Sequence, residues 1–249
     1  MADGAGAVAR RYFRQDLSVE QKSDASPVTV ADREAETVMR ALIEESFPDH
    51  GIVGEEFGAD TKDARFVWVL DPIDGTKRFI TGNALFGCLI ALLDHGRPVL
   101  GVIDMPILEE RWIGAAGRAT SHRDRRGHRQ VSTRSCRALD QAALYATSPH
   151  MFEGADLDGF ETVRRQTQQT SYGGECYSYG LLASGFVDLV IEADMGVYDF
   201  LPLVSVVTGA GGIMTDWQGQ PLGLHSDGRV VAAGDQRVHA AALAGLTPG

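Results

Sequence analysis

Two aspartates lie close together directly after an apolar run, in the segment VWVLDPIDGTKRF at residues 67–79. The negative charges of Asp71 and Asp74 repel each other, so their proximity needs an explanation. Either the pair forms a turn by accepting hydrogen bonds from nearby backbone N–H groups, or a cation lies between the two carboxylates. Taken alone, Asp71 is compatible with both interpretations.

The residues that follow favour the cation. Gly75 lets the backbone approach a ligand closely, and Thr76 begins a helical turn whose free N–H groups would attract an anion. An anion site beside two carboxylates is consistent only if cations lie between them. Mg²⁺ takes oxygen ligands and bridges carboxylates to phosphate groups. A pair of such ions about 3.5–4 Å apart can stabilise the attacking and leaving oxygens of an in-line displacement. The segment therefore predicts magnesium-dependent phosphate chemistry.

The first half of the chain contains the elements that must position these residues. DPIDGT, residues 71–76, is interpreted as a turn that opens a helical segment reaching residue 82. Apolar periodicity and turn residues predict the other elements: helices at 4–17 and from about 32 to 47, strands at 52–58 and 65–70, a hairpin at 86–106, a strand at 109–117 and an arginine-rich polar stretch at 118–130.

The second half of the chain alternates strands with helices. The pattern predicts strands at 142–149, 187–194, 213–222 and 228–234, and helices at 157–169, 198–212 and 235–245, with 170–185 a turn that leads into a helix. The change of pattern near residue 130 predicts two lobes with a site between them: an N-terminal α+β lobe at 1–130 and a C-terminal α/β lobe at 131–249.

Composition excludes several classes of protein. With 249 residues, 44% hydrophobic and 23% charged, the chain is long and apolar enough to form a substantial core. Its net charge of −11 argues against a general nucleic-acid binder, so the arginine-rich residues 121–129 are expected to form a solvated hairpin loop or a subunit contact. No apolar run approaches the roughly 20 residues that a membrane span needs. The odd number of cysteines and the absence of a signal-peptide pattern predict a reducing, cytoplasmic location.

Four motifs together resemble the inositol monophosphatase family: GEE at 54–56, DPIDGT at 71–76, YDFLPL at 198–203 and GAGG at 209–212. The resemblance extends over nearly the whole chain. It implies an α/β (α+β) fold, a layered αβαβα sandwich, and a hydrolase that uses two or three Mg²⁺ ions per site. It also implies a small-molecule phosphate ester as the substrate, no nucleic-acid or membrane partner, and a homodimer.

The resemblance assigns roles to individual residues. It implies a set of metal ligands: Glu55, Asp71, the carbonyl of Ile73, Asp74 and Asp199. Gly75 and Thr76 would bind the phosphate, and Glu55, Asp32 and Thr76 would orient the attacking water. Tyr198 stands where the family more often has Trp. Three alternatives stay open: Glu55 as a solvated charge at a strand end, and Asp32 and Asp199 as helix caps.

The segments YGGECYSYGLLASG and DPIDGTKRFITG are most similar to the histidinol-phosphate phosphatase branch of the family. The implied substrate pocket contains Gly173, Gly174, Glu175 and Glu192, and an acidic Glu175 would suit a substrate with an amine. Alternatively, Glu175 faces solvent. The predicted function is therefore hydrolysis of histidinol phosphate in histidine biosynthesis. Inositol monophosphatase is the second prediction, followed by a 3′,5′-bisphosphate nucleotidase or a non-enzymatic relative that binds metal or phosphate.

Overall fold

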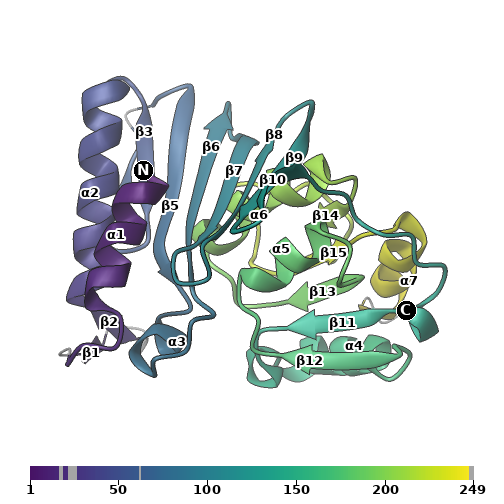
Figure 1. Ribbon diagram of the computed structural model, residues 1–249. Coiled ribbons are helices and arrows are strands. Elements are labelled where there is room, and N and C mark those ends of the chain that lie inside the picture. Colours follow the sequence, from purple (N-terminus) through teal and green to yellow (C-terminus); the bar gives the residue numbers. More distant parts are fainter. Residues whose placement is uncertain (17–18, 22–26, 62, 247–249) are drawn as a thin grey trace.

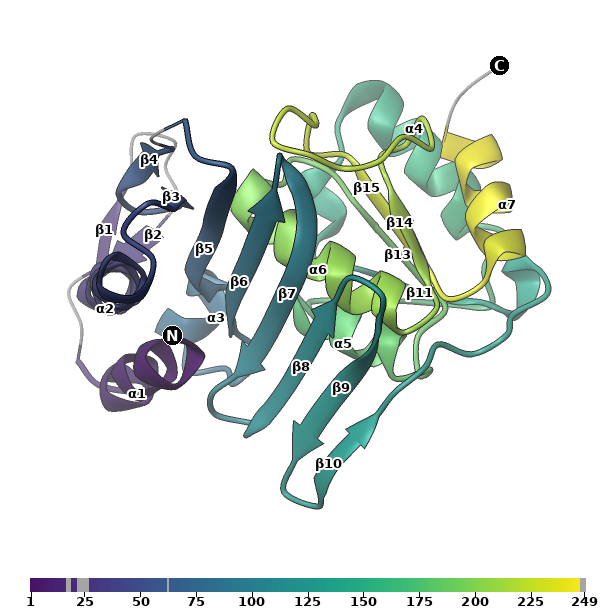
Figure 2. The same ribbon diagram turned by 90° about the horizontal axis from the view of Figure 1, so that it is seen from above.

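The computed structural model of the chain describes residues 1–16, 19–21, 27–61 and 63–246. Its elements form five layers, seen edge-on in Figure 1 and from above in Figure 2. Helices α1 and α2 cover one face of a large sheet, α5 and α6 separate this sheet from a smaller one, and α4 and α7 cover the outer face of the smaller sheet. The layered αβαβα sandwich expected from the sequence is confirmed.

The larger sheet has eight strands in the order β10-β9-β8-β7-β6-β5-β3-β4. Only β3 and β5 are parallel neighbours; the other pairs are antiparallel. The strands are β3 (Gly51–Gly54), β4 (Gly58–Asp60), β5 (Phe66–Asp74), β6 (Gly87–Asp94), β7 (Arg97–Met105), β8 (Glu110–Ala115), β9 (Arg118–Asp124) and β10 (Gly127–Gln130).

The smaller sheet has five strands in the order β12-β11-β13-β15-β14. Strands β12, β11 and β13 are parallel, whereas β15 runs antiparallel to both of its neighbours. The strands are β11 (Ala143–Ala146), β12 (Gln169–Tyr172), β13 (Leu189–Glu192), β14 (Ile213–Thr215) and β15 (Val230–Ala233). A separate two-stranded pair, β1 (Val19–Gln21) and β2 (Pro27–Thr29), precedes α2.

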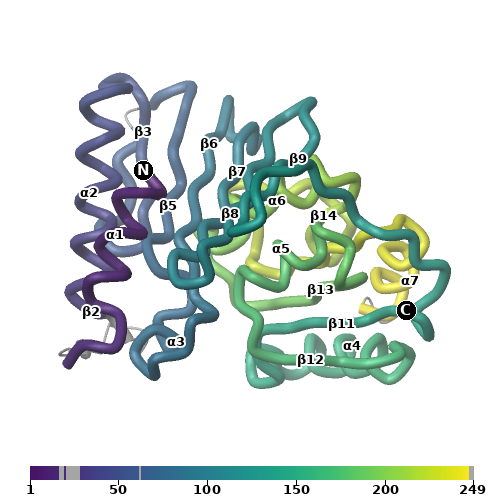
Figure 3. Tube along the Cα trace, in the orientation of Figure 1, coloured from purple at the N-terminus to yellow at the C-terminus, as the bar shows by residue number. Residues whose placement is uncertain are grey.

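The helices begin in one outer layer with α1 and finish in the opposite outer layer with α7 (Figure 3). They are α1 (Ala2–Tyr12), α2 (Val30–Ser46), α3 (Thr76–Ile80), α4 (Gly154–Arg164), α5 (Tyr177–Ala183), α6 (Val197–Gly209) and α7 (Gln236–Leu246), with short 3₁₀ turns η1 (Leu139–Gln141) and η2 (Pro149–Met151). Among the described residues, no helix has the length and apolar character needed to cross a bilayer.

Strand β5, inside the larger sheet, is buried on both faces because its alternate residues enter different cores. In β5, Trp68 and Leu70 pack beneath α1 and α2, while Val67 and Val69 face the central layer of α5 and α6. The central core also includes Val230 of β15 and other side chains from the second half of the chain. Division of the chain into lobes at residue 130 therefore stays a prediction, although the two sheets are built from different halves.

Several predicted elements differ from the observed ones. DPID was predicted as a turn, but β5 continues through it: Asp71 pairs with Leu89 and Asp74 with Gly87, with a register shift between them. Helix α1 ends at Tyr12 instead of residue 17, since Phe13 is extended. Residues 169–172 form an edge strand, β12, which a polar QTSY sequence does not reveal. The arginine-rich stretch forms the paired strands β9 and β10.

Helix α6 lies unusually close to the large sheet because two sheet residues facing it are glycines. A Cβ atom at Gly101 of β7 would overlap the carbonyl oxygen of Pro202, and one at Gly114 of β8 would overlap the carbonyl oxygen of Ser205. Proline 202 lies inside α6. The close approach sets the position of the N-terminal turn of α6, which carries Asp199 toward the end of β5.

We predict that Gly101→Ala lowers the free energy of unfolding by about 1–3 kcal/mol, the range for overpacking a close contact. The measurement is the urea unfolding curve. Gly223→Ala is the matched control, because the nearest atom to a Cβ there is 4.0 Å away. Equal stability of the two variants would contradict the close packing of α6 on the sheet.

Candidate metal centre and substrate cavity

Three carboxylates meet where β5 ends and α6 begins. Asp71, Asp74 and Asp199 each offer an oxygen, and these oxygens lie within 4.8 Å of one another. Asp71 is buried, while the other two are half-buried. The cluster joins residues more than 120 positions apart in the sequence, so it depends on how α6 is placed against the sheet.

Glu55 belongs beside this cluster because β3 and β5 are parallel and in register. Gly54 at the end of β3 pairs with Leu70, and the N–H of Glu55 donates to the carbonyl of Leu70 at 3.1 Å. The negative charge of Glu55 contributes to raising the pKa values of Asp71 and Asp199. The fold therefore brings Glu55 close to the aspartates and does not leave it as an isolated solvated charge, while its role as a metal ligand, which the family resemblance implies, stays a prediction.

Asp71 makes the local backbone hydrogen bond that the turn interpretation expected, although β5 continues through this segment, and the bond coexists with the cluster. Oδ1 of Asp71 accepts a hydrogen bond from the N–H of Ile73 at 3.0 Å. The carbonyl of Ile73 accepts from the hydroxyl of Thr76 at 3.2 Å. Gly75, with φ 85° and ψ 40°, then turns the chain into α3, a left-handed conformation that favours glycine.

Burial and mutual repulsion raise the pKa values of the clustered aspartates. For Asp71 and Asp199 the pKa lies well above the usual 3.8, first because of burial and then because of the neighbouring carboxylates. Burial also raises the pKa of Asp74, against hydrogen bonding from Cys176 that lowers it. An all-oxygen donor set whose negative charges destabilise one another fits a hard divalent cation such as Mg²⁺, which would remove the repulsion.

Asp199 belongs both to the carboxylate cluster and to the N-terminal cap of α6. It lies in the first turn of α6, and its Oδ2 accepts from the N–H of Gly196, the N-cap residue, at 2.7 Å. The helix-capping alternative and the cluster are thus both observed.

Asp32 and Thr76 are joined directly. The Thr76 hydroxyl lies 3.2 Å from Oδ1 of Asp32, while Oδ2 of Asp32 accepts from the N–H and hydroxyl of Thr29 at 2.8 and 2.6 Å. Thr29 is the N-cap of α2, and Asp32 completes the capping box. Burial raises the pKa of Asp32, and the bonds from Thr29 partly offset this. Asp32 is therefore both part of a helix cap and a neighbour of the predicted phosphate turn.

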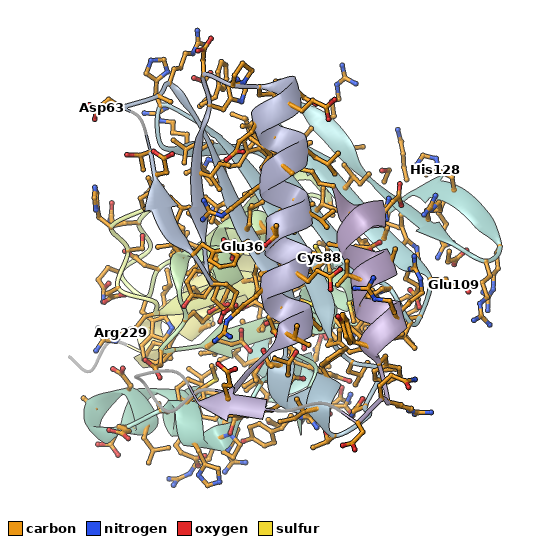
Figure 4. All side chains as sticks on the ribbon, turned by 90° about the vertical axis from the view of Figure 1, so that its left-hand side faces the viewer. Glu36, Asp63, Cys88, Glu109, His128 and Arg229 are labelled. Atoms are coloured by element: carbon orange, nitrogen blue, oxygen red, sulfur yellow. The ribbon has the colours of Figure 1, made fainter. Side chains whose placement is uncertain are left out.

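Glu36 is a buried residue of the site that the sequence interpretation missed. It lies on the side of α2 that faces β3 and β4 (Figure 4). Its carboxylate accepts from the N–H groups of Glu56 and Phe57 at 2.7 and 3.3 Å, and pairs with Arg40 at 2.7 Å. These bonds fix the segment that carries Glu55. One signal was present, since Glu36 shares the buried stripe of α2 with Asp32, Ala35, Met39 and Ile43.

A cavity of about 130 Å³ opens beside the carboxylate cluster. Asp74 and Asp199 form one wall, and two further glutamates line it. In the ranges that the structure describes, the lining contains no lysine, arginine or histidine; it consists of Asp74, Thr147, Met151, Glu175, Cys176, Tyr179, Glu192, Asp194, Met195, Asp199 and Leu203. Its surroundings would thus favour a positively charged or hydroxyl-bearing group.

Glu192 is held at the back of this cavity. Its carboxylate accepts from the N–H of Thr147 and the hydroxyl of Tyr179, both at 2.8 Å. Burial raises its pKa to about 7, against these two hydrogen bonds. Each carboxylate oxygen keeps a second acceptor position, so Glu192 can still contact a ligand.

Glu175 lines the cavity instead of facing solvent. Its Oε1 accepts from Nε of Arg78 at 2.8 Å. Burial raises the pKa of Glu175 above its usual value, and the hydrogen bond from Arg78 offsets only part of this effect. Gly173 and Gly174 are buried behind it and do not line the cavity: a Cβ there would overlap the Arg78 guanidinium and the Ser178 hydroxyl, respectively. Direct contact of the two glycines with substrate stays a prediction.

Cys176 positions Asp74 through its backbone. Its N–H donates to Oδ2 of Asp74 at 2.8 Å, which links the second half of the chain to the carboxylate cluster. The thiol is buried, and burial with the nearby charge of Asp74 raises its pKa well above the usual value. All three cysteines are buried and free. Because every residue except proline has a backbone N–H, the identity of residue 176 could not reveal this contact.

Comparisons with known proteins agree with this geometry. A sequence model described as "Inositol monophosphatase family" matches residues 1–248. The chain is 50% identical over 255 residues to "Bifunctional phosphatase IMPL2, chloroplastic" of Arabidopsis thaliana, which covers 99% of this chain and 72% of that protein. It is 36% identical to a "Histidinol-phosphatase" of Streptomyces coelicolor, over 96% of this chain and 91% of that protein. A solved structure described as an inositol monophosphatase from Zymomonas mobilis has a TM-score of 0.88 and 49% identity, over 98% and 94% of the two chains.

We predict that the metal-free protein loses stability as pH rises above the usual aspartate pKa of 3.8 and through the raised pKa values of the folded cluster. The folded aspartates have pKa values above 3.8, so the folded state binds more protons than the unfolded state in this range, and that contribution disappears as pH increases. Urea unfolding in EDTA measures the effect, and added Mg²⁺ should reduce it. Asp199→Asn should weaken the pH dependence, whereas Asp158→Asn, an exposed control, should not. Identical pH profiles for Asp199→Asn and wild type would contradict the cluster.

We further predict that Glu36→Gln raises the Mg²⁺ concentration needed for half-maximal stabilisation by about tenfold or more, the usual effect of losing a group that orients a metal ligand. The amide would offer only one oxygen acceptor where the carboxylate now offers two. Mg²⁺ titration followed by thermal unfolding measures this shift. Glu44→Gln, an exposed change on the same helix, is the control. An unchanged titration midpoint for Glu36→Gln would show that Glu36 does not position Glu55.

Proposed function

Because the chain belongs to the inositol monophosphatase family, we propose that it is a Mg²⁺-dependent phosphoric monoester hydrolase whose substrate is histidinol phosphate. The observation that carries the proposal is the position of the carboxylate cluster, which adjoins a cavity lined by further carboxylates and by no basic side chain. The first feature suits a metal-bound phosphate, and the second suits a substrate whose remaining part is positively charged.

The proposed metal ligands are Glu55, Asp71, the Ile73 carbonyl, Asp74 and Asp199, with Asp32 near a third, weaker ion. When bound, Mg²⁺ neutralises the charge of the phosphoryl group and lowers the pKa of a water molecule so that it can attack near neutral pH. The N–H groups of Gly75 and Thr76 would bind the phosphate oxygens.

Thr76 and Asp32 would orient the attacking water. The Thr76 hydroxyl has one proton and two acceptors at 3.2 Å, Asp32 Oδ1 and the Ile73 carbonyl. Donation to Asp32 leaves a lone pair of Thr76 free to accept a hydrogen bond from the water, and Glu55 would hold the water from the other side. The water oxygen would form a bond to phosphorus as the ester P–O bond breaks, one proton of the water would end on the departing oxygen, and histidinol and inorganic phosphate would be the products. No covalent enzyme intermediate is required, and the protonated Cys176 thiol takes no part.

The acidic lining of the cavity supports histidinol phosphate as the substrate. This ester carries an amine and an imidazole, and the cavity offers Glu175, Glu192 and Asp194 to them. A 3′,5′-bisphosphate nucleotide would place a second phosphate among these carboxylates, which repel it. The similarity to a histidinol-phosphatase of S. coelicolor also supports this substrate.

Inositol monophosphate is the second candidate. The 49% identity to the Z. mobilis structure described as an inositol monophosphatase favours it, and Glu192 could accept hydrogen bonds from ring hydroxyls. A non-enzymatic relative would require loss of a ligand or of Thr76, and all of these residues are present. Cytoplasmic location and assembly into a homodimer remain predictions from the sequence.

We predict that purified protein releases phosphate from histidinol phosphate with higher kcat/KM than from inositol monophosphate, and from neither in excess EDTA. Asp74→Asn should lower kcat by about a hundredfold or more, because metal stabilisation of the transition state is worth several kcal/mol. The fold of this variant should persist, and Asp158→Asn should match wild type. Preference for inositol monophosphate would replace the substrate assignment, while metal binding without release from either ester would favour the non-enzymatic alternative.

A further inference from the structure

The cavity glutamate Glu175 has a partner that lies outside the cavity. Arg78 belongs to α3, directly after the predicted phosphate turn, and its Nε donates to Glu175 Oε1 at 2.8 Å. The Arg78 side chain is 33% exposed and the Glu175 side chain 9%. Glu175 lines the cavity and Arg78 does not. The arginine therefore contacts the carboxylate from behind.

The backbone around this pair is adapted to it. Gly173 has φ 87°, and a Cβ atom there would overlap the guanidinium of Arg78. Glu175 itself has φ 42°, a left-handed conformation that is unfavourable for a residue with a side chain. Arg78 thus packs closely against the turn before α5, and the ion pair helps to hold Glu175 in a conformation that it would otherwise leave.

The second oxygen of Glu175 has no partner. Oε2 is buried and, within the part of the chain that the structure describes, makes no hydrogen bond. A buried carboxylate oxygen without a donor is costly, and its position on a cavity-lining residue points to a donor that arrives with a ligand. Oε1 already accepts from Arg78, so Oε2 is the carboxylate oxygen that has both acceptor positions available to that donor.

The pair also lies next to the predicted phosphate turn. A Cβ atom at Gly75 would be 3.2 Å from Cγ of Glu175. The side chain of Glu175 therefore packs against the turn that is proposed to bind phosphate, where an uncompensated negative charge would be unfavourable and the positive charge of Arg78 offsets it. A substrate with a phosphate and an ammonium group on a short chain could therefore place its ammonium group at Glu175, whose charge Arg78 partly balances, without strong repulsion of its phosphate.

We propose that Arg78 is a positioning residue for substrate recognition: it fixes Glu175 through Oε1 so that Oε2 receives the ammonium group of an amine-bearing phosphate ester. The inference rests on the proposed function and deepens it, because it names the substrate group that Glu175 recognises and the residue that prepares it. Arg78 itself touches neither the phosphate nor the amine.

The experiment compares histidinol phosphate with its desamino analogue, which lacks only the amine, at saturating Mg²⁺. Arg78→Gln should lower kcat/KM for histidinol phosphate by about tenfold, mainly through KM, as expected for a misplaced charge-assisted hydrogen bond. The analogue should lose much less. Arg78→Lys, which keeps the charge but not the planar fork, should lie between wild type and Arg78→Gln. Arg237→Gln removes an exposed arginine paired with Asp235 and is the control.

A double variant separates positioning from general damage. If Arg78 acts through Glu175, adding Arg78→Gln to Glu175→Gln should cause little further loss on histidinol phosphate. Equal losses on both esters, or fully additive losses in the double variant, would overturn the inference while leaving the proposed function intact. Wild-type protein that hydrolyses other phosphate esters but not histidinol phosphate would overturn the proposed substrate, and this inference with it.

Discussion

Repulsion among buried carboxylates is the constraint on which this structure depends. Asp71, Asp74 and Asp199 bring their oxygens within 4.8 Å of one another, in surroundings that raise the pKa of each. A fold can keep such a group only if the rest of the structure holds each member in place. The backbone positions these residues. The parallel strands β3 and β5 bring Glu55 next to Asp71, and the irregular end of β5 separates Asp71 from Asp74. The close packing of α6 on Gly101 and Gly114 places Asp199 beside them.

A second set of contacts holds the residues that carry the charges. Glu36 accepts from the backbone beside Glu55, the N–H of Cys176 donates to Asp74, and Gly196 donates to Asp199. The N–H groups of Cys176 and Gly196 each contact one oxygen of their aspartate, so these contacts orient the cluster without neutralising its charge. The arginines nearest to the site pair with glutamates outside the cluster: Arg40 pairs with Glu36, and Arg78 pairs with Glu175. The chain therefore leaves room for cations at the centre and supplies arginines only at its edge.

The family resemblance predicted the fold class and the grouping of Asp199 with the other aspartates, whereas local signals alone predicted that Asp71 and Asp74 lie together after a strand. VWVLDPIDGT, residues 67–76, places two carboxylates and a glycine directly after an apolar strand, and YDF at 198–200 is a second recognisable motif. The bulged strand through DPID and the edge strand at QTSY were not predicted, since pairing partners and not local propensity make them strands. Glu36 was detectable as a charge within a buried helical stripe. Arg78 was not, because nothing local indicates that residue 78 meets residue 175.

The distribution of charge explains how a chain with a net charge of −11 can bind an anionic ester. In the proposed function, attraction to the phosphate would depend on cations recruited by the carboxylates and on the N–H groups after β5, and not on the overall charge. For the proposed substrate the same acidic character would be an advantage, because the carboxylates that line the cavity would attract its amine and would repel a second phosphate. Overall acidity and phosphate binding are thus compatible when the substrate carries both charges. On this argument, selectivity arises from the distance between the carboxylate cluster and Glu175, which must match the distance between phosphate and ammonium in the ester.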